Sequence, residues 1–407
     1  MPTQPSGALS GRRVLELADA TGAYCGKLLA DLGADVIKLE PPGGDPSRRM
    51  PPGDSPGEGG EERLSFLYMN TSKRGVPLDL RKPESRGLLA ELASRADLVI
   101  ETLPPGTLDG LEIGYESLRQ HNPRLVLTSI TGFGQSGPHR DFRSSDLVAS
   151  ALGGAMTVTG EEDDPPVRLA GSQAHVAAST VAAVSSLIAL LASSQRGEGQ
   201  HVDISVQEVV GSVSHICGVG KWLDDGIIPK RRGTGLFASV PSGAYPCRDG
   251  SVYLMVNRPL HWVALAEWVH EVTGNQEILD PMFEGPSSSR LPYRELLDLF
   301  ISDLMCQLDV EEVYREGQRR HIAITPVNTV AAVAADPHLA ARGFFEQVDH
   351  PTAGRLTYPG APYRHSKTPW RIQRPAPTPG QHNREVYCDE LGLSEAALQT
   401  LESKGVV

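Results

Sequence analysis

A histidine at position 175 stands where an apolar helix is predicted to begin. The segment Arg168-Leu-Ala-Gly-Ser-Gln-Ala-His175 leads into a run of small apolar residues, and Ser172 is a suitable N-cap. His175 would lie in the first turn, where the helix dipole lowers the pKa of an imidazole and favours its neutral form. A neutral imidazole can act as a general base or accept an acyl group as an acyl-imidazole. It can also contact a ligand without catalysis, or be an inert, hydrogen-bonded side chain, and the sequence leaves these roles open.

Other residues with chemical potential do not form a known ligand-binding pattern. The glycines of Gly132-Phe-Gly134 and Gly137-Pro138 are not followed by the Gly-Lys-Ser/Thr of a Walker loop, so tight turns around a site are expected. Four further histidines lack the spacing of metal ligands and are interpreted as structural or surface residues: His201, His215, His321 and His350. The sequence therefore predicts no metal centre.

Charge and cysteine content limit the class of protein. The 407 residues can form two ordinary domains or one large one. A net charge of −12 argues against nonspecific nucleic-acid binding, while a local basic patch could still bind a phosphorylated ligand. Five cysteines without a CxxC pair indicate neither a zinc ribbon nor a disulfide framework: Cys25, Cys217, Cys247, Cys306 and Cys388.

The apolar run at about 174–193 is long enough to suggest a membrane span. His175 and several Ser and Thr residues interrupt it, and most of its residues are small. We therefore interpret it as a buried helix packed closely against its neighbours. The N-terminal residues lack the charged-then-apolar pattern of a signal peptide, so a soluble cytoplasmic protein is expected.

Residues 12–40 have the pattern of a strand, a helix and a second strand. Short apolar segments at 13–17 and 35–40 are typical of buried strands, and 21–32 has helical spacing with Gly33 at its end. This βαβ unit implies an α/β fold with a parallel sheet, whose ligands bind at the carboxyl ends of the strands. Further strands are predicted at 97–101, 125–128 and 200–205, and helices near 83–95, 114–120, 172–195 and up to about 221. The Pro/Gly-rich loop 41–62 is expected near the ligand.

The pattern changes after Gly243, where a short hairpin and then helices are predicted. Large apolar residues mark the expected core of this part: Trp262, Trp268, Leu297 and Phe300. After Val333 the chain is expected to return to the first body and to end in a helix near 393–402. We therefore assign 1–222 and 334–407 to a large α/β domain, and 223–333 to a linker and a smaller α+β domain.

Seven blocks, taken in their order and spacing, resemble the class III CoA-transferases, the CaiB/BaiF family that includes formyl-CoA transferases and α-methylacyl-CoA racemases. They are Leu32–Asp45, Asn70–Asp79, Pro105–Tyr115, Thr131–Pro138, Gly197–Ser205, Asp349–Gly354 and Gly380–Val386. The resemblance implies a large Rossmann-like domain built from both chain ends and a small domain. It also implies two interlocked chains with the active site at their interface, and binding of CoA thioesters without a metal.

The resemblance also implies a covalent mechanism, in which an aspartate attacks the donor acyl-CoA and forms first a mixed anhydride and then an aspartyl-CoA thioester. That aspartate lies nine residues after Pro166 and 25 residues before Gln200, and both counts lead to His175. An imidazole cannot form this anhydride. The related racemases keep the aspartate and place a histidine directly before an acid that corresponds to Asp146, where this chain has Ser145. Asp146 is expected to be structural.

The same resemblance predicts which residues bind CoA. Lys73 and Arg74 are expected at the nucleotide phosphates, together with Arg143, because arginine suits bidentate phosphate contacts. Lys38, Arg48 and Arg49 flank the loop 41–62 and could reach the same phosphates. A loop of Asp19, Ala20 and Thr21 is expected at the thioester and pantetheine, and Thr102 with Leu103 is expected to clasp the CoA.

Three hypotheses follow. The first is a CoA-transferase that moves CoA between carboxylic acids, as a homodimer or together with an aspartate-bearing paralogous subunit. The second is an independent isomerase, epimerase, hydrolase or lyase that uses His175 as its acid/base residue. The third is a CoA-thioester-binding subunit without catalysis.

Overall fold

The computed structural model describes residues 7–49, 64–214, 218–236 and 239–407. Contacts between residues group the chain into two compact units. Unit 1 contains 1–155, 168–226 and 341–407, and unit 2 contains 156–167 and 227–340. The domain boundaries predicted from the sequence lie at 222/223 and 333/334, close to those of the two units. The prediction assigns 156–167 to the large domain, whereas the contacts group this segment with unit 2.

Unit 1 contains a six-stranded sheet in the order β3-β2-β1-β4-β5-β6, and every neighbouring pair is parallel. The strands are β1 (Arg13–Leu17), β2 (Asp35–Glu40), β3 (Arg74–Pro77), β4 (Leu98–Glu101), β5 (Val126–Thr131) and β6 (His201–Ser205). This confirms the predicted parallel α/β fold. The strand order reverses between β1 and β4, so the connections leave a crevice at the carboxyl ends of these two strands.

Alternate residues of each strand are buried on opposite faces of the sheet, as the period of two requires. Val14 belongs to one core and Leu15 to the other, and Val36 and Ile37 of β2 divide in the same way. Both faces are therefore covered, which is the usual condition of a parallel sheet.

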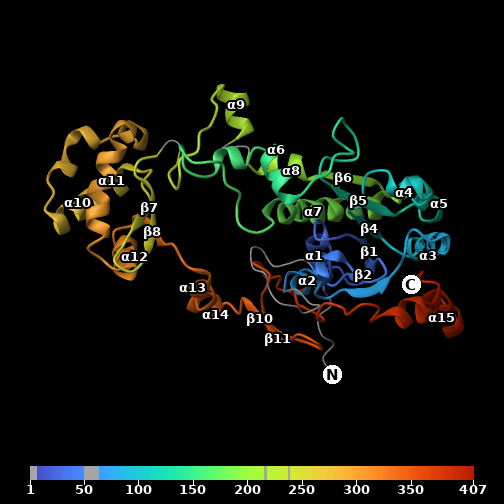
Figure 1. The fold of residues 1–407 in the computed structure, drawn as a ribbon. Coiled ribbons are helices and arrows are strands. Elements are labelled where there is room, and N and C mark those ends of the chain that lie inside the picture. The colour runs from blue at the N-terminus through green and yellow to red at the C-terminus, as the bar shows by residue number, and fades with distance from the viewer. Residues whose placement is uncertain (1–6, 50–63, 215–217, 237–238) are drawn as a thin grey trace. The chain divides into compact units, whose positions relative to one another are not determined.

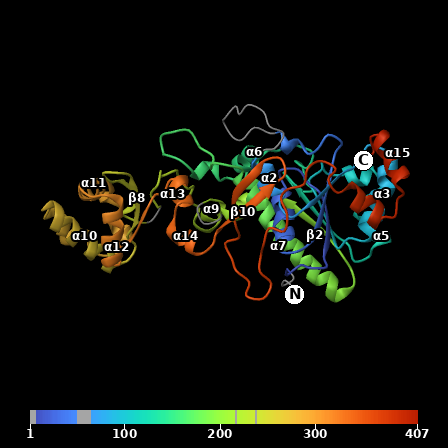
Figure 2. The ribbon, with the colours of Figure 1, turned by 90° about the horizontal axis from the view of Figure 1, so that it is seen from below.

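Helices cover the two faces in separate layers (Figures 1 and 2). One face carries α1 (Ala23–Asp31), α6 (Asp146–Leu152), α7 (Gln173–Arg196) and α8 (Val206–Val213). The other carries α3 (Pro83–Ser94), α4 (Thr107–Gly110), α5 (Tyr115–His121) and α15 (Glu395–Ser403). Unit 1 also contains α2 (Leu64–Met69), α9 (Val219–Asp225), the hairpin β10 (Phe345–His350) and β11 (Gly354–Pro359), and a π-helical turn at Arg384–Glu390. The single helix predicted up to 221 is thus two helices, α8 and α9.

Helix α7 is the long apolar helix of the sequence analysis. By length and composition it is the one helix in the described ranges that could cross a membrane, and 44% of its apolar window is buried. Its buried side is made of small residues such as Ala178, Ala182 and Ser186, which allow close packing against α1, α8 and the sheet. Its exposed side is also apolar and includes Val184, Ile188 and Leu191. The expected close packing is confirmed for one side only.

Unit 2 has its own core. Three antiparallel strands, β7 (Ser242–Pro246), β8 (Ser251–Met255) and β9 (Ala323–Pro326), form its sheet. Its helices are α10 (Pro259–Thr273), α11 (Arg294–Met305), α12 (Val310–Arg319) and α13 (Val330–Ala334), and α14 (Pro337–Ala341) ends at the boundary with unit 1. Trp262, Trp268 and Leu297 are buried as predicted, and Phe300 is partly buried against them.

Candidate functional site

A cleft of about 580 Å³ opens at the carboxyl ends of β1, β4 and β5, where the strand order reverses. It lies within unit 1. Six residues that the sequence analysis selected line it together: Asp19, Thr21, Thr102, Leu103, Arg143 and His175. Ala20, from the same predicted loop, is exposed and is not among the lining residues.

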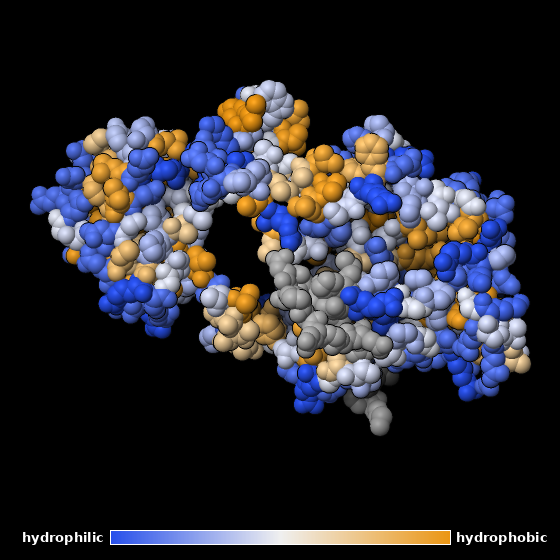
Figure 3. Space-filling view, in the orientation of Figure 1, coloured by the Kyte–Doolittle hydropathy of each residue, from blue (hydrophilic) through white to orange (hydrophobic). Residues whose placement is uncertain are grey.

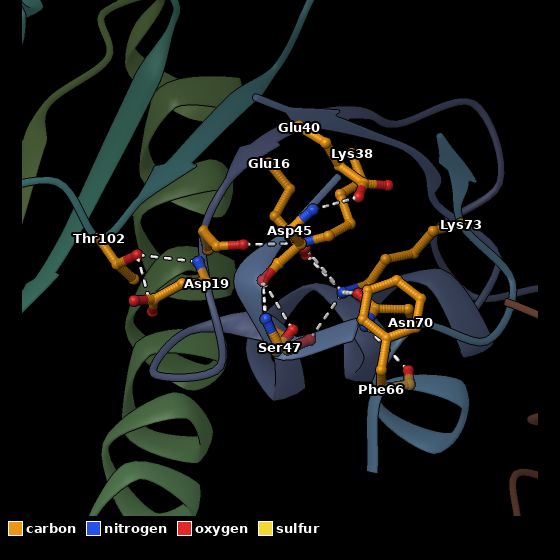
Figure 4. Close-up of polar contacts among 12 residues, drawn as sticks. Glu16, Asp19, Lys38, Glu40, Asp45, Ser47, Phe66, Asn70, Lys73 and Thr102 are labelled. Atoms are coloured by element: carbon orange, nitrogen blue, oxygen red, sulfur yellow. Dashed lines mark hydrogen bonds and ion pairs between the residues drawn. The ribbon is translucent and has the colours of Figure 1, made fainter. Parts of the chain in front are cut away.

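A reciprocal pair of hydrogen bonds joins the loops after β1 and β4 (Figure 4). The backbone N–H of Asp19 donates to Thr102 Oγ1 at 3.0 Å, and the Thr102 hydroxyl donates back to Asp19 Oδ1 at 3.1 Å. The backbone N–H of Thr21 also donates to Oδ1, at 2.8 Å. Oδ1 is therefore held by two donors, and Oδ2 has no hydrogen-bond partner within the described part of the chain.

Two buried lysines fix the ends of the loop that carries Asp19. Lys38 Nζ donates to the Ala18 carbonyl at 2.6 Å, and Lys73 Nζ donates to the Ala23 carbonyl at 2.8 Å. Both ammonium groups also pair with Glu16, at 3.2 and 2.7 Å, and Asp45 pairs with Lys38 at 2.7 Å (Figure 4). These buried and mutually compensated charges therefore hold the two ends of the segment from Ala18 to Ala23.

This geometry does not favour the phosphate contacts predicted for Lys73 and Arg74. Lys73 is completely buried, and burial, opposed by Glu16, lowers the pKa of its ammonium group to about 8. Arg74 is 6% exposed and pairs with Asp35 and Glu390, at 2.7 and 2.6 Å. Neither residue lines the cleft. Their phosphate role stays a prediction, whereas their structural role is visible in the contacts.

Two of the other cations proposed for the phosphates, Lys38 and Arg48, have similar surroundings, whereas Arg49 is exposed. Lys38 is buried beside Glu16, and Arg48 is buried and paired with Glu40 at 2.6 Å. The far part of the loop 41–62, from residue 50 onward, lies outside the described residues.

His175 lies in the first turn of α7, which begins at Gln173, as predicted, but the cap differs from the prediction. Ser172 occupies the N-cap position without a side-chain hydrogen bond to the helix. Instead, Asp146 Oδ1 accepts the backbone N–H of His175 at 3.1 Å. A carboxylate from α6 thus satisfies a free N–H group of α7 and complements its dipole. This hydrogen bond at the start of α7 is a contact that fits the structural role expected for Asp146.

The pKa of His175 is lowered below its ordinary value of 6.5, chiefly by burial, while the carboxylates of Asp146 and then Asp19 act in the opposite direction. The imidazole is therefore neutral at pH 7. The sequence analysis expected the neutral form because of the helix dipole, and the cause identified in the structure is desolvation by burial.

The mouth of the cleft is basic and aromatic. Arg140 and Arg143 both line the cleft, and Arg140 pairs with the neighbouring Asp141 at 3.3 Å. Phe142, which is 61% exposed, stacks on His139 at 4.7 Å between ring centroids. Sequence reasoning missed Arg140, although it stands only three residues before Arg143. Gly132 lines the cleft too, as expected for the glycine segment. A Cβ at this position would collide with Ser144, so the residue must be glycine for the backbone to pass there.

A buried hydroxyl in the cleft was also missed. Thr131 is 7% exposed, lines the cleft, and its Oγ1 has no hydrogen-bond partner among the residues described. Buried hydroxyl groups normally have a partner, so a bound ligand or water would satisfy it. Nothing in the sequence distinguishes Thr131 from other strand-end threonines.

A hydrogen-bonded network lies behind the β4 loop, in a second cavity of about 290 Å³. Glu101 accepts the backbone N–H of Leu103 at 2.6 Å, and Ser129 Oγ lies 2.9 Å from His201 Nε2. Burial raises the pKa of Glu101 to about 7, with Ser129 hydrogen bonding to its carboxylate in opposition. This network supports the loop that lines the cleft. His201 belongs to it, and the contact with Ser129 is a structural role of the kind predicted for His201.

No group of three or more His, Cys, Asp or Glu side chains within the described ranges is placed to hold a metal ion. The cleft can bind an anion at its arginines and present a carboxylate, a neutral imidazole and a hydroxyl to a reacting group.

Comparison with known proteins points in the same direction. The sequence model described as CoA-transferase family III matches residues 9–383. The chain is 36% identical to succinyl-CoA:(R)-benzylsuccinate CoA-transferase subunit BbsE of Thauera aromatica, over 97% of each chain. It is 34% identical to succinyl-CoA–D-citramalate CoA-transferase of Chloroflexus aurantiacus, over 99% of each.

Among solved structures, a CaiB/BaiF family protein from Brucella suis superimposes with a TM-score of 0.82. It is 29% identical, over 95% of this chain and 100% of that one. The sequence blocks, the parallel sheet and these full-length matches agree, and the chain belongs to CoA-transferase family III.

Proposed function

We propose that the protein transfers CoA from an acyl-CoA thioester to a free carboxylic acid. The observation that carries this proposal is the cleft at the β1/β4 switch point, which gathers Asp19, Thr102, Arg143 and His175 from four separate segments. A cleft with cations at its mouth and a carboxylate inside suits a thioester that carries phosphates at its far end.

In this proposal, Arg140 and Arg143 bind the phosphates of CoA, and the thioester lies beside Asp19 and His175. Arginines at the mouth can contact phosphate oxygens in pairs. Thr131 has a buried hydroxyl available for the ligand. Leu103, held through Glu101, forms part of the wall along which the ligand lies.

We propose succinyl-CoA as the first donor to test. The two relatives from Thauera and Chloroflexus carry succinyl-CoA in their names, and both match the chain over nearly its whole length. The acceptor is a carboxylic acid that the sequence does not identify.

We further propose that the protein works in the cytoplasm as an assembly of two chains, either identical or paralogous. The exposed apolar side of α7 supports such an interface, with Val184, Ile188 and Leu191 exposed by 54%, 63% and 60%. Figure 3 shows further apolar side chains over α9 and near α6. Such a surface favours a protein partner. The name of the Thauera relative describes a subunit, which supports an assembly of more than one chain.

The experiment is an exchange assay. The purified protein is incubated with succinyl-CoA and a panel of carboxylic acids, and new CoA thioesters are separated by chromatography and identified by mass. Formation of a new thioester without loss of total thioester supports transfer. Loss of thioester to free CoA indicates a hydrolase, and the absence of both reactions, alone and with a paralogous chain, contradicts the proposal.

A second candidate is an acyl-CoA isomerase, favoured by the neutral imidazole of His175 between Asp19 and Asp146. A neutral imidazole can remove a proton next to the thioester carbonyl. Incubation in D₂O separates the two functions, since an isomerase incorporates deuterium into the acyl group without any acceptor acid.

A further inference from the structure

We propose that Asp19 is the carboxylate that forms the covalent intermediates in this chain. The inference rests on the proposed function, CoA transfer, and assigns the nucleophile that His175 cannot supply. Resemblance places the family nucleophile at position 175, so the residue argued for here comes from the contacts of this structure alone.

The first argument is the orientation of the Asp19 carboxylate. Its Oδ1 accepts from the Thr21 N–H at 2.8 Å and the Thr102 hydroxyl at 3.1 Å, which fixes the plane of the group. Oδ2 accepts no hydrogen bond within the described ranges, although Asp19 lines the cleft. A carboxylate with one oxygen anchored and the other free is oriented for attack on a bound carbonyl carbon.

The second argument is the support below the loop. Lys38 and Lys73 hold the carbonyls of Ala18 and Ala23, one on each side of Asp19, and both lysines are themselves buried. A reacting group needs such support, because small displacements of a nucleophile reduce the rate strongly.

The third argument is that other carboxylates near the site are engaged. Asp146 accepts the backbone N–H of His175 at 3.1 Å and does not line the cleft. Asp141 and Asp19 both line the cleft and are both exposed, but Asp141 pairs with Arg140 at 3.3 Å. Asp19 is therefore the cleft carboxylate that has no ion pair in the described residues, and it lines the cleft together with His175.

The chemistry balances with Asp19 in this role. Oδ2 attacks the thioester carbonyl carbon, the C–S bond breaks, and the CoA thiolate leaves a mixed anhydride. The thiolate then attacks Cγ of Asp19, releases the donor as its carboxylate and forms an aspartyl-CoA thioester. The acceptor carboxylate attacks Cγ and expels the thiolate, giving a second anhydride. The thiolate finally attacks the acceptor carbonyl, which releases the new thioester and restores the Asp19 carboxylate.

His175 has a supporting role in this scheme. Its side chain lines the cleft together with Asp19, and its backbone N–H donates to Asp146, so it helps to shape the site without forming a bond to the acyl group. It is a positioning residue here, and its replacement by glutamine is expected to leave an adduct on Asp19 detectable.

The test traps the aspartyl thioester. The full-length protein is incubated with succinyl-CoA, reduced with borohydride, which converts a thioester-linked aspartate to homoserine, and mapped by peptide mass spectrometry. The proposal expects homoserine at position 19. It also expects Asp19→Asn to lose CoA exchange by at least ~10³-fold, as for removal of other nucleophiles. Asn keeps the Oδ1 acceptor for Thr21 and Thr102, so the variant should fold.

Asp349→Asn is the control, because it removes an exposed carboxylate that does not line the cleft, and exchange should stay within a few-fold of the unmodified protein. Label on another residue, or exchange retained by Asp19→Asn, overturns the assignment of Asp19 while CoA transfer stands. Exchange that appears only with an aspartate-bearing paralogous chain likewise overturns Asp19 and keeps CoA transfer. No exchange under either condition overturns both.

Discussion

The replacement Glu101→Gln tests the network behind the cleft quantitatively. Glu101 is 4% exposed, and burial raises the pKa of its carboxyl from the ordinary value of 4.5 to about 7. The negative charges of Asp203 and Asp109 act in the same direction as burial. A difference of about 2.5 pKa units corresponds to about 3 kcal/mol against the ionised form in the folded state, as an upper estimate.

The sign of the pH dependence follows from proton binding. Because the folded state holds the Glu101 proton more tightly, it binds more protons than the unfolded chain between about pH 4.5 and pH 7. The free energy of unfolding therefore falls as the pH rises through this window. Glutamine copies the neutral carboxyl, since its carbonyl can accept the Leu103 N–H and its amide can donate to Ser129.

We expect Glu101→Gln to be more stable than the unmodified protein by up to about 3 kcal/mol at pH 8.5, and nearly equal to it at pH 4.5. Urea unfolding of both proteins at the two pH values measures this difference. The control is Glu116→Gln, whose carboxylate is 74% exposed and paired with Arg119, so its effect should be below about 1 kcal/mol at either pH. A Gln variant that is less stable at pH 8.5, or shifted equally at both pH values, would refute the reasoning.

Three further predictions address the site and the assembly. Lys73→Met should lower the free energy of unfolding, measured with urea, by about 3 kcal/mol, because Glu16 loses a buried partner. The KM for the acyl-CoA should stay unchanged. A raised KM with normal stability would instead support a phosphate contact. Arg143→Gln should raise KM by about 10- to 100-fold at unchanged kcat, measured in the exchange assay, because a charge-assisted hydrogen bond contributes about 1.5–3 kcal/mol. Ile188→Lys, on the exposed side of α7, should shift sedimentation from the assembled species to the single chain; an unchanged profile argues against that interface.

Much of the architecture could be predicted because it depends on local patterns. Short apolar strands that alternate with helices required a parallel sheet covered on both faces, and the glycine at 33 ended the first helix, where its φ is +107°. The exact extents of helices depended on packing, as the division into α8 and α9 shows. The cap on α7 could not be predicted, since Asp146 lies 29 residues from His175 and reaches it only because α6 packs against α7.

The sequence by itself determined the parallel fold, the family and the segments that surround the ligand, because residue order, periodicity and motif spacing are properties of the chain. The tertiary structure decided what each polar residue does. Lys73 could equally have faced a phosphate or Glu16, and burial made it a buried ion-pair partner. Asp19 and Thr102, 83 residues apart, meet because β1 and β4 are neighbours in the sheet. Charge, solvation and distance depend on neighbours brought together by folding, so the candidate nucleophile emerged only from the structure.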